Sequence, residues 1–201
     1  MSIIPEDTVL IRRALKGDES AYADLVRRYQ DRVSRLALRI TRRPDLVPDL
    51  CQEVFIAAFT NLARFKRRSG FMTWLHRITV NASLAALRRE EASSRMLTRA
   101  QEAGELPDTI IVRDQDSGER MLLNRELQLE IHEALDRLSA EDRAILTLRY
   151  LEEFSTPELA EILDLPPGTV RSKLYYARLK LAEILDPALA RARRSPKSKE
   201  S

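Results

Sequence analysis

The sequence predicts an all-α protein built from two small helical domains that are joined by a flexible acidic linker. Apolar residues recur every three or four positions over most of the 201 residues, which is the spacing of one helix face. No segment alternates polar and apolar residues as a half-buried strand does. Between Glu90 and Arg120 the helical periodicity is lost, and serine, glycine, proline and acidic residues replace it.

The composition bounds the class of protein. Hydrophobic residues make up 44% and charged residues 32%, a balance typical of compact helical domains rather than of disorder. No apolar run approaches the ~18 residues that span a bilayer. The first ten residues carry acidic side chains where a signal peptide needs positive charge. We therefore expect a cytoplasmic protein with no direct membrane insertion.

Four helices are predicted in the first domain, residues 1–92. A short helix ends at Lys16-Gly17, and Asp18 can cap the next helix. One apolar stripe runs along this second helix, through Leu25, Tyr29, Val33, Leu36 and Ile40. A third helix is predicted over 45–62 and a fourth over 72–89, with a basic loop over 64–70 between them. Cys51 is the only cysteine, which excludes an intrachain disulfide, and we expect it to pack as a small hydrophobic residue.

A linker over 93–122 and a second domain over 123–187 are predicted next, followed by a basic disordered tail over 188–201. Ser139 and Ser155 each have an acidic residue three positions later, which is the spacing of a helix cap. Prolines at 166 and 167 then separate a short helix from a longer one that carries basic side chains. This order predicts a helix-turn-helix, whose second helix can enter the major groove of DNA. A helical hairpin with a solvated polar face is the alternative.

Charge is unevenly divided between the two domains. Residues 1–92 hold 17 Lys and Arg against 11 Asp and Glu, a net charge of +6. Residues 123–186 hold 8 Lys and Arg against 13 Asp and Glu, a net charge of −5. A basic first half suits a polyanionic partner, whereas the acidic second domain suggests that its DNA binding depends on a partner.

The segment 167–174, Pro-Gly-Thr-Val-Arg-Ser-Lys-Leu, followed by Ala-Arg-Leu-Lys-Leu at 177–181, resembles the −35-reading segment of extracytoplasmic-function sigma factors of the sigma-70 family. Segments 138–143 and 146–150 also fit that family's fourth region. Tyr176 stands where the family often has arginine, and Arg171 can make paired hydrogen bonds to a guanine. The resemblance implies −35 DNA contacts at Arg149, Thr169, Arg171, Ser172, Lys173, Tyr175, Tyr176 and Arg178.

The segment 49–55, Asp-Leu-Cys-Gln-Glu-Val-Phe, resembles the part of these sigma factors that binds core polymerase. Asp49, Glu53 and Ile56 fall on one helical face, with Gln52 beside them. The resemblance implies that this face meets the clamp coiled coil of the largest polymerase subunit, and that the second domain meets the beta flap. The alternative for this face is a solvated polar surface.

The segment 71–81, closed by Leu-Arg-Arg at 87–89, resembles the family's −10 segment, which captures a base that has left the stack. The resemblance places the pocket for that base at Asn81 and the loop 65–71, and we expect Trp74 to be a core anchor instead. The implied contacts with −10 DNA are Arg64, Lys66, Arg67, Arg68, Phe71, Arg77, Asn81, Arg88 and Arg89.

No catalytic site, cofactor or metal site is predicted. His76 and His132 are the only histidines and have no companions at metal-ligand spacing, and no glycine-rich phosphate loop or nucleophile elbow is present. The resemblance implies an alternative sigma factor that binds core RNA polymerase, promoter DNA and an anti-sigma factor, without a small-molecule substrate. Two alternatives stay open: a stand-alone helix-turn-helix transcription regulator, and a helical adaptor that sequesters an anti-sigma factor.

Overall fold

The computed structural model describes residues 5–65, 70–98, 131 and 133–186, and all regular elements in these ranges are helical. They are α1 (Pro5–Ala14), α2 (Glu19–Thr41), η1 (Pro44–Leu46), α3 (Val47–Asn61), η2 (Leu62–Arg64), α4 (Phe71–Thr98), α6 (Ala140–Leu146), the π-helical turn η3 (Thr147–Leu151), α7 (Thr156–Leu163) and α8 (Pro167–Leu185). Most of the predicted linker and the predicted tail lie outside the described residues.

The helix starts follow the capping residues that the sequence indicates. Asp18 accepts a hydrogen bond from the backbone N–H of Ala21 at the start of α2. Ser155 and Glu158 form a reciprocal capping box at the start of α7. Such caps satisfy backbone N–H groups that have no partner within the helix. The predicted caps are therefore confirmed.

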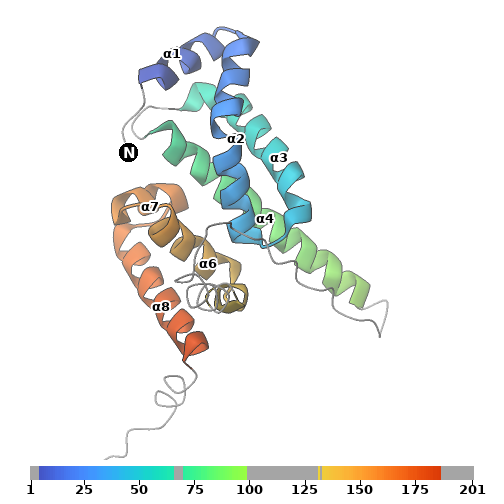
Figure 1. Cartoon of the computed structure of the whole chain (residues 1–201), viewed down its shortest axis with the longest axis vertical. Coiled ribbons are helices and arrows are strands. Elements are labelled where there is room, and N and C mark those ends of the chain that lie inside the picture. Colours follow the sequence, from blue (N-terminus) through green and yellow to red (C-terminus); the bar gives the residue numbers. More distant parts are fainter. Residues whose placement is uncertain (1–4, 66–69, 99–130, 132, 187–201) are drawn as a thin grey trace, which may run out of the picture.

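Helices α1 to α4 surround a first core. Figure 1 shows α2, α3 and α4 side by side, with α1 across the end of α2. Leu25, Tyr29 and Val33 of α2 are at most 2% exposed in this core. Trp74 lies at its margin, half-buried, with its ring centroid 5.3 Å from that of Phe65. Trp74 is therefore a packing residue, as predicted.

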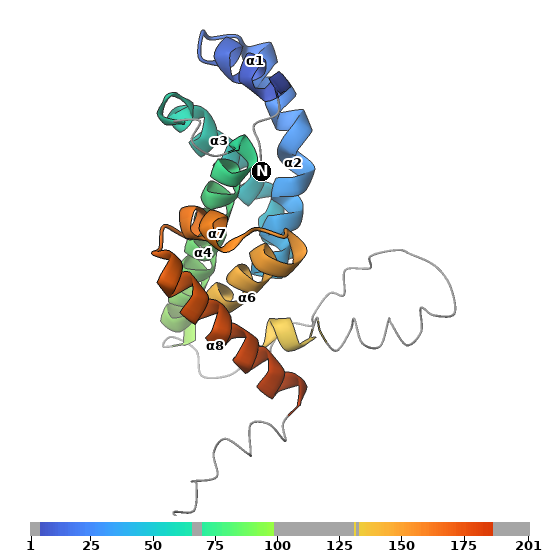
Figure 2. The ribbon, with the colours of Figure 1, turned by 90° about the vertical axis from the view of Figure 1, so that its left-hand side faces the viewer.

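A second core includes residues of both predicted domains. Helices α6, α7 and α8 pack around apolar side chains such as Leu148, Leu159 and Val170, all fully buried. The same cluster contains Leu36 and Ile40 of α2, together with Val80 of α4, from the first domain. Figure 2 shows α6 and α7 against the first domain, with α8 outside them. The described parts of the two domains are thus packed directly against each other.

Helix α4 is longer than the sequence predicted. It continues past Arg89 to Thr98 and so includes the first part of the segment that was predicted as linker. Residues 90–98 contain no glycine or proline, and serine costs a helix only a few tenths of a kcal/mol relative to alanine. Residues 91–94 of this extension are exposed, so the polar composition here belongs to a solvated part of α4 rather than to the start of the linker.

Candidate nucleic-acid and protein interfaces

The face predicted to bind core polymerase is exposed on α3. Asp49, Gln52, Glu53 and Ile56 are all accessible, and the apolar side chain of Ile56 is 59% exposed. Leu50 and Val54 point the other way, into the first core. A single exposed apolar side chain is common on protein surfaces, so exposure alone does not assign a partner to this face. The binding role of this face stays a prediction.

Phe59 extends this face, and sequence reasoning did not select it. It lies one turn beyond Ile56 and is 50% exposed. Its ring makes an edge-on contact with Tyr22 at a centroid distance of 4.7 Å, which holds it in place. The spacing of Gln52, Ile56 and Phe59 along one helix face was the signal that could have identified it.

The residues predicted to bind −10 DNA have different environments. Arg64 and Asn81 are exposed. Arg89 donates to Glu53 at 3.1 Å, and Arg77 and Arg88 donate to carboxylates of the second domain. Lys66, Arg67 and Arg68 lie outside the described residues.

Phe71 requires a correction. The resemblance implied that it contacts DNA, but it is only 2% exposed. Its ring packs against Tyr29, Phe65 and Trp74, at centroid distances of 5.3 to 5.6 Å. A side chain that is enclosed in this way anchors the start of α4 and does not reach DNA.

The residues predicted to read −35 DNA lie on the solvent face of α8. Thr169, Arg171, Ser172, Lys173, Tyr175, Tyr176 and Arg178 are all exposed. Val170, Leu174 and Ala177 are buried on the opposite face. Arg149 differs from the others, because its guanidinium donates to the carbonyl of Phe154 at 2.8 Å and so holds the turn before α7. Arg149 therefore has a structural role in the second domain.

His76 lies in the boundary between the domains, and sequence reasoning gave it no role beyond excluding a metal site. It is 2% exposed, and its ring meets the ring of Phe154 edge-on at 4.9 Å. Neither ring nitrogen has a hydrogen-bond partner among the described residues, although Nε2 lies 3.8 Å from Oε2 of Glu152. Burial lowers the pKa of His76 to about 4, with Arg32 adding to the effect. The imidazole is therefore neutral at pH 7.

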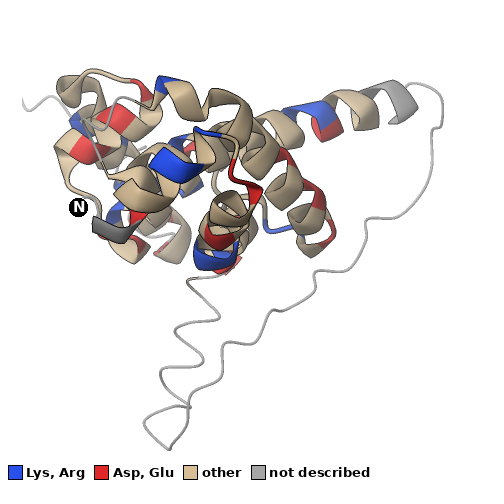
Figure 3. Ribbon diagram, turned by 90° about the horizontal axis from the view of Figure 1, so that it is seen from above, with Lys and Arg blue, Asp and Glu red and all other residues tan. Residues whose placement is uncertain are grey.

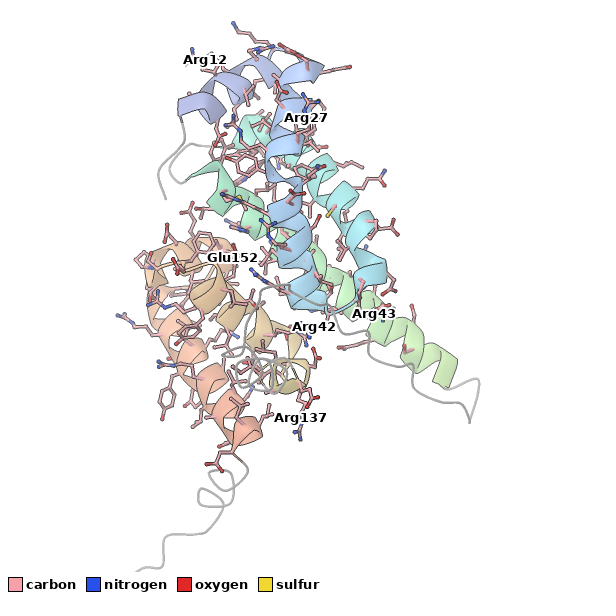
Figure 4. All side chains as sticks on the ribbon, in the orientation of Figure 1. Arg12, Arg27, Arg42, Arg43, Arg137 and Glu152 are labelled. Carbon is pink, nitrogen blue, oxygen red and sulfur yellow. The ribbon has the colours of Figure 1, made fainter. Side chains whose placement is uncertain are left out.

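Among the residues that the structure describes, four arginine–carboxylate pairs cross the same boundary. Each joins an arginine of the first domain to a carboxylate of the second: Arg39 to Glu152 at 2.7 Å, Arg42 to Asp136 at 2.5 Å, Arg77 to Asp164 at 2.9 Å and Arg88 to Glu141 at 3.0 Å. Figure 4 labels Glu152 of the second domain and Arg42 of the first, and Figure 3 shows the basic and acidic positions of the ribbon from above.

A buried arginine adds a further anchor between the domains. Arg143 of α6 is 7% exposed, and its Nε donates to the carbonyl of Ile40, near the end of α2, at 2.7 Å. A second nitrogen, Nη1, donates to the carbonyl of Leu135 at 3.2 Å. Burial lowers the pKa of Arg143 from its ordinary value. The bond to Ile40 satisfies a carbonyl that the end of α2 leaves without a helical partner.

Within the described residues, no helix has the length and apolar character needed to span a bilayer. In the same part of the chain, no three side chains among His, Cys, Asp and Glu are grouped as metal ligands.

Two family models match the chain, in the order in which the two predicted domains occur. Residues 25–93 match the model for sigma-70 region 2, and residues 128–181 match the model for sigma-70 region 4. The first range covers α3 and most of α2 and α4, and the second covers α6, α7 and most of α8.

Relatives are similar over nearly their whole length. The chain is 36% identical to the ECF RNA polymerase sigma-E factor of Haemophilus influenzae, over 91% of this chain and 97% of that protein. It is 37% identical to the protein of the same name in Escherichia coli, over 92% and 97% of the two chains. The RNA polymerase sigma-H factor of Pseudomonas aeruginosa is 33% identical, over 93% and 97%.

Two solved structures share the fold. One is CnrH in complex with the cytosolic domain of CnrY, with a TM-score of 0.60 and 24% identity, covering 91% of this chain and 99% of that chain. The other is the sigma factor RpoE in complex with the anti-sigma factor NepR from Bartonella quintana. It has a TM-score of 0.61 and 22% identity, covering 82% and 96% of the two chains.

Proposed function

The chain belongs to the extracytoplasmic-function sigma factors of the sigma-70 family, and from this premise we propose which of its surfaces bind polymerase and which bind promoter DNA. As an alternative sigma factor it directs core RNA polymerase to specific promoters. The observation that carries the assignment is the presence of region 2 and region 4 in one chain, each with an exposed face of the expected chemistry.

The first domain binds polymerase and −10 DNA in this proposal. Asp49, Gln52, Glu53 and Ile56, extended by Phe59, form an exposed face of mixed acidic and apolar character that suits a basic partner helix. Arg64, Arg77, Asn81, Arg88 and Arg89, with Lys66, Arg67 and Arg68 of the loop, supply positive charge for the phosphates of separated strands and a polar side chain for an unstacked base.

The second domain binds −35 DNA as duplex. The exposed side chains of α8 offer hydrogen-bond donors and aromatic edges to the major groove, and its buried face keeps the helix on the domain. The net charge of −5 in residues 123–186 opposes DNA binding, so the domain needs core polymerase, through its flap, to hold it at the promoter.

Three further properties belong to this proposal. The protein acts in the cytoplasm, where RNA polymerase works. It carries no catalytic activity of its own and opens the promoter by binding energy alone. An anti-sigma factor controls it, because the two structures that share its fold are complexes, one of them with a named anti-sigma factor.

Transcription with purified components tests the proposal. The chain and core polymerase together should give promoter-specific transcripts that neither component gives alone. Footprinting of the complex should protect both promoter elements. Equally tight promoter binding without core would contradict the sigma assignment and favour a stand-alone regulator.

Charge reversal on α3 tests the polymerase-binding face. Glu53→Lys should weaken holoenzyme assembly, because it opposes a basic partner and ends the contact with Arg89. Asp31→Lys, an equal charge change at an exposed position of α2, is the matched control and should assemble normally. Normal assembly of both variants would show that this face is misplaced.

A further inference from the structure

Five arginines form one stripe along α2 and its C-cap, beside the apolar stripe of that helix. They follow each other three or four positions apart, at positions 28, 32, 35, 39 and 42. The first, fourth and fifth each form an ion pair with a carboxylate. Arg32 and Arg35 lie between them, and both are exposed and form no hydrogen bond or ion pair within the described residues. The middle of the stripe therefore carries two positive charges that the described part of the chain does not pair.

A pocket of about 310 Å³ lies beside these two arginines. It is lined by residues of both domains: Arg32, Arg35, Arg39, Met72, His76 and residues 151–154. This lining contains three arginines and two glutamates, and one of the glutamates, Glu152, is already paired with Arg39. The pocket thus keeps a net positive charge, and its volume is at the lower end of the ~300–1,000 Å³ that is usual for small-molecule sites.

The same pocket is lined by a buried polar side chain. His76 is 2% exposed, and neither ring nitrogen forms a hydrogen bond among the described residues. A neutral imidazole has one N–H donor and one acceptor, and leaving them unpaired in a buried position costs free energy. Burial, together with the charge of Arg32, lowers the pKa of His76 to about 4. The charge of Arg32 therefore reaches the ring, and an anion between the two groups satisfies both.

We propose that this pocket binds a compact phosphate-bearing anion of the size of a diphosphate group, with Arg32, Arg35 and His76 as the groups that hold it. A guanidinium group donates two parallel N–H groups to phosphate oxygens, and two guanidinium groups three positions apart on a helix can hold neighbouring phosphates. The N–H of neutral His76 adds a donor from the buried side. Met72 and Phe154 are at most 5% exposed and keep water from that side, which strengthens the attraction between opposite charges.

The volume of the pocket favours a small anion over an acidic segment of a protein. One turn of α-helix is ~10 Å wide and ~5.4 Å long, and so is larger than the pocket. Two sources carry the chemistry that fits: free inorganic pyrophosphate, and the diphosphate of a nucleotide whose nucleoside projects into solvent. Neither Arg32 nor Arg35 belongs to the DNA-binding surfaces proposed above, so the site is additional to the sigma-factor function.

Isothermal titration calorimetry on the full chain tests the site, with inorganic pyrophosphate and, separately, guanosine diphosphate as probes. The test variant is Arg32→Gln with Arg35→Gln, which removes the two unpaired charges of the stripe. The matched control is Arg12→Gln with Lys16→Gln, which removes two charges at exposed positions that have no ion pair in the described ranges. Figure 4 shows Arg12 on α1, well away from Glu152.

The test variant should lose affinity for pyrophosphate by roughly tenfold or more, since hydrogen bonds between charged groups are among the strongest in proteins. The control should change this affinity by less than about twofold, because salt screens exposed charges that lie far from the ligand. Tighter binding of guanosine diphosphate than of pyrophosphate would identify a nucleotide as the source of the anion, and the reverse order would identify the free anion.

His76 provides a second readout, which a general loss of charge does not move. His76 and His132 are the only histidines, so His132→Gln leaves one imidazole to follow by nuclear magnetic resonance. Bound pyrophosphate should raise the pKa of His76 above about 4, because it adds negative charge beside the ring. The charged groups that line the pocket around the ring are Arg32, Arg35, Arg39, Glu152 and Glu153.

Three results would overturn the proposal: no binding of either probe, equal pyrophosphate affinity in the test and control variants, or binding that leaves the resonances of His76 unchanged. If neither probe binds and the test variant loses affinity for promoter DNA, then Arg32 and Arg35 contact the DNA backbone instead.

Discussion

The two proposed DNA-binding surfaces of this sigma factor differ in what covers them. On α8, Arg171 and Arg178 face solvent and form no ion pair within the described ranges. On α4, Arg77 and Arg88 are paired with carboxylates of the other domain. The proposed −35 residues are thus accessible, whereas two arginines of the proposed −10 surface are paired.

The difference follows from charge and from helix orientation. The second domain is acidic overall, and its carboxylates at the boundary face the first domain. Four of its basic residues lie exposed on α8 instead: Arg171, Lys173, Arg178 and Lys180. A domain of this polarity can dock on a basic neighbour and still leave its own DNA-binding helix exposed. With the DNA-binding roles proposed above, α8 stays accessible for −35 duplex while two arginines of the −10 surface are paired within the chain.

The largest expected effect comes from the apolar contacts between the domains, where Ile40 of α2 packs in the core built by α6, α7 and α8. Ile40→Ala should cost the docking of the domains about 2–5 kcal/mol, because Ile40 is fully buried in the core that the second domain contributes. Nitroxide labels at Lys16→Cys and Leu185→Cys, in a Cys51→Ala background of the full chain, report the distance between the domains by electron paramagnetic resonance. Both positions are exposed. This distance should increase, because an open state with separated domains replaces the closed state that the structure describes.

The control for this variant is Leu25→Ala, a comparable loss within the first core. It should lower the melting temperature of the first domain without separating the domains. If Ile40→Ala also lowers the melting temperature without separating the domains, then Ile40 stabilises the first domain alone. In that case the apolar contacts do not hold the two domains together.

The position of Ile40 also shows what sequence reasoning could and could not find. The stripe Leu25, Tyr29, Val33, Leu36 and Ile40 was correctly predicted to be buried, because period alone identifies the buried face of a helix. The structure divides that stripe, with the first three residues in one core and the last two in the other. Periodicity says that a residue is buried but not which element covers it.

Local features were predicted best. The capping pairs at Ser139 and Ser155, and the break before α8, depend on residues within a few positions of each other. The contacts between the domains join residues about fifty to more than a hundred positions apart, such as Arg88 with Glu141 and Arg39 with Glu152. A predicted flexible linker gives no reason to expect them, because it leaves the relative placement of the domains open.

The open −35 surface is tested by Arg171→Ala. If Arg171 reads a guanine, affinity for the −35 duplex should fall by about 1–3 kcal/mol, and by the same amount in the closed chain and in the Ile40→Ala variant. The reason is that α8 is exposed whether or not the domains are docked. Fluorescence anisotropy with labelled duplexes measures the affinity for −35 DNA. Equal losses on every −35 sequence would identify a phosphate contact instead of base reading.

Acid should weaken docking through His76. Its pKa is about 4 when it is buried under Phe154 and about 6.5 when it is free, so the open state binds the proton more tightly. The stability of the closed state is therefore complete above pH 6.5 and falls as the pH drops toward 4. At pH 5.5 roughly ten of every eleven free imidazoles are protonated, whereas the buried imidazole stays almost entirely neutral. The loss is therefore about 1.4 kcal/mol, the free-energy equivalent of a tenfold change in an equilibrium.

The charged groups around His76 oppose each other. Arg32 on α2 disfavours its protonation, whereas the carboxylate of Glu152, 3.8 Å from Nε2, favours it. The other charged residues that line the same pocket are Arg35, Arg39 and Glu153. Burial is the largest of these influences, and it lowers the pKa of His76. The label distance at pH 7.5 and at pH 5.5 measures the effect, and His76→Gln should remove the difference. A pH dependence that survives in His76→Gln would assign it to another group.

The smallest expected effect compares the two surfaces directly. In the free chain, Arg88→Ala should change the affinity for single-stranded −10 DNA by less than about 1 kcal/mol, because Arg88 is already paired with Glu141 and an exposed ion pair contributes only ~0.2–1 kcal/mol. Arg178 is an exposed arginine of α8 that has no ion-pair partner in the described part of the chain. Arg178→Ala should therefore lower the affinity for −35 DNA already in the free chain. In the holoenzyme the two losses should become similar, since both arginines are then free to bind phosphate. Fluorescence anisotropy on the free chain and on the holoenzyme measures the loss of DNA affinity that each of the two substitutions causes. If Arg88→Ala already weakens the free chain as much as Arg178→Ala does, then Glu141 does not compete with DNA for Arg88, and the two surfaces are equally accessible.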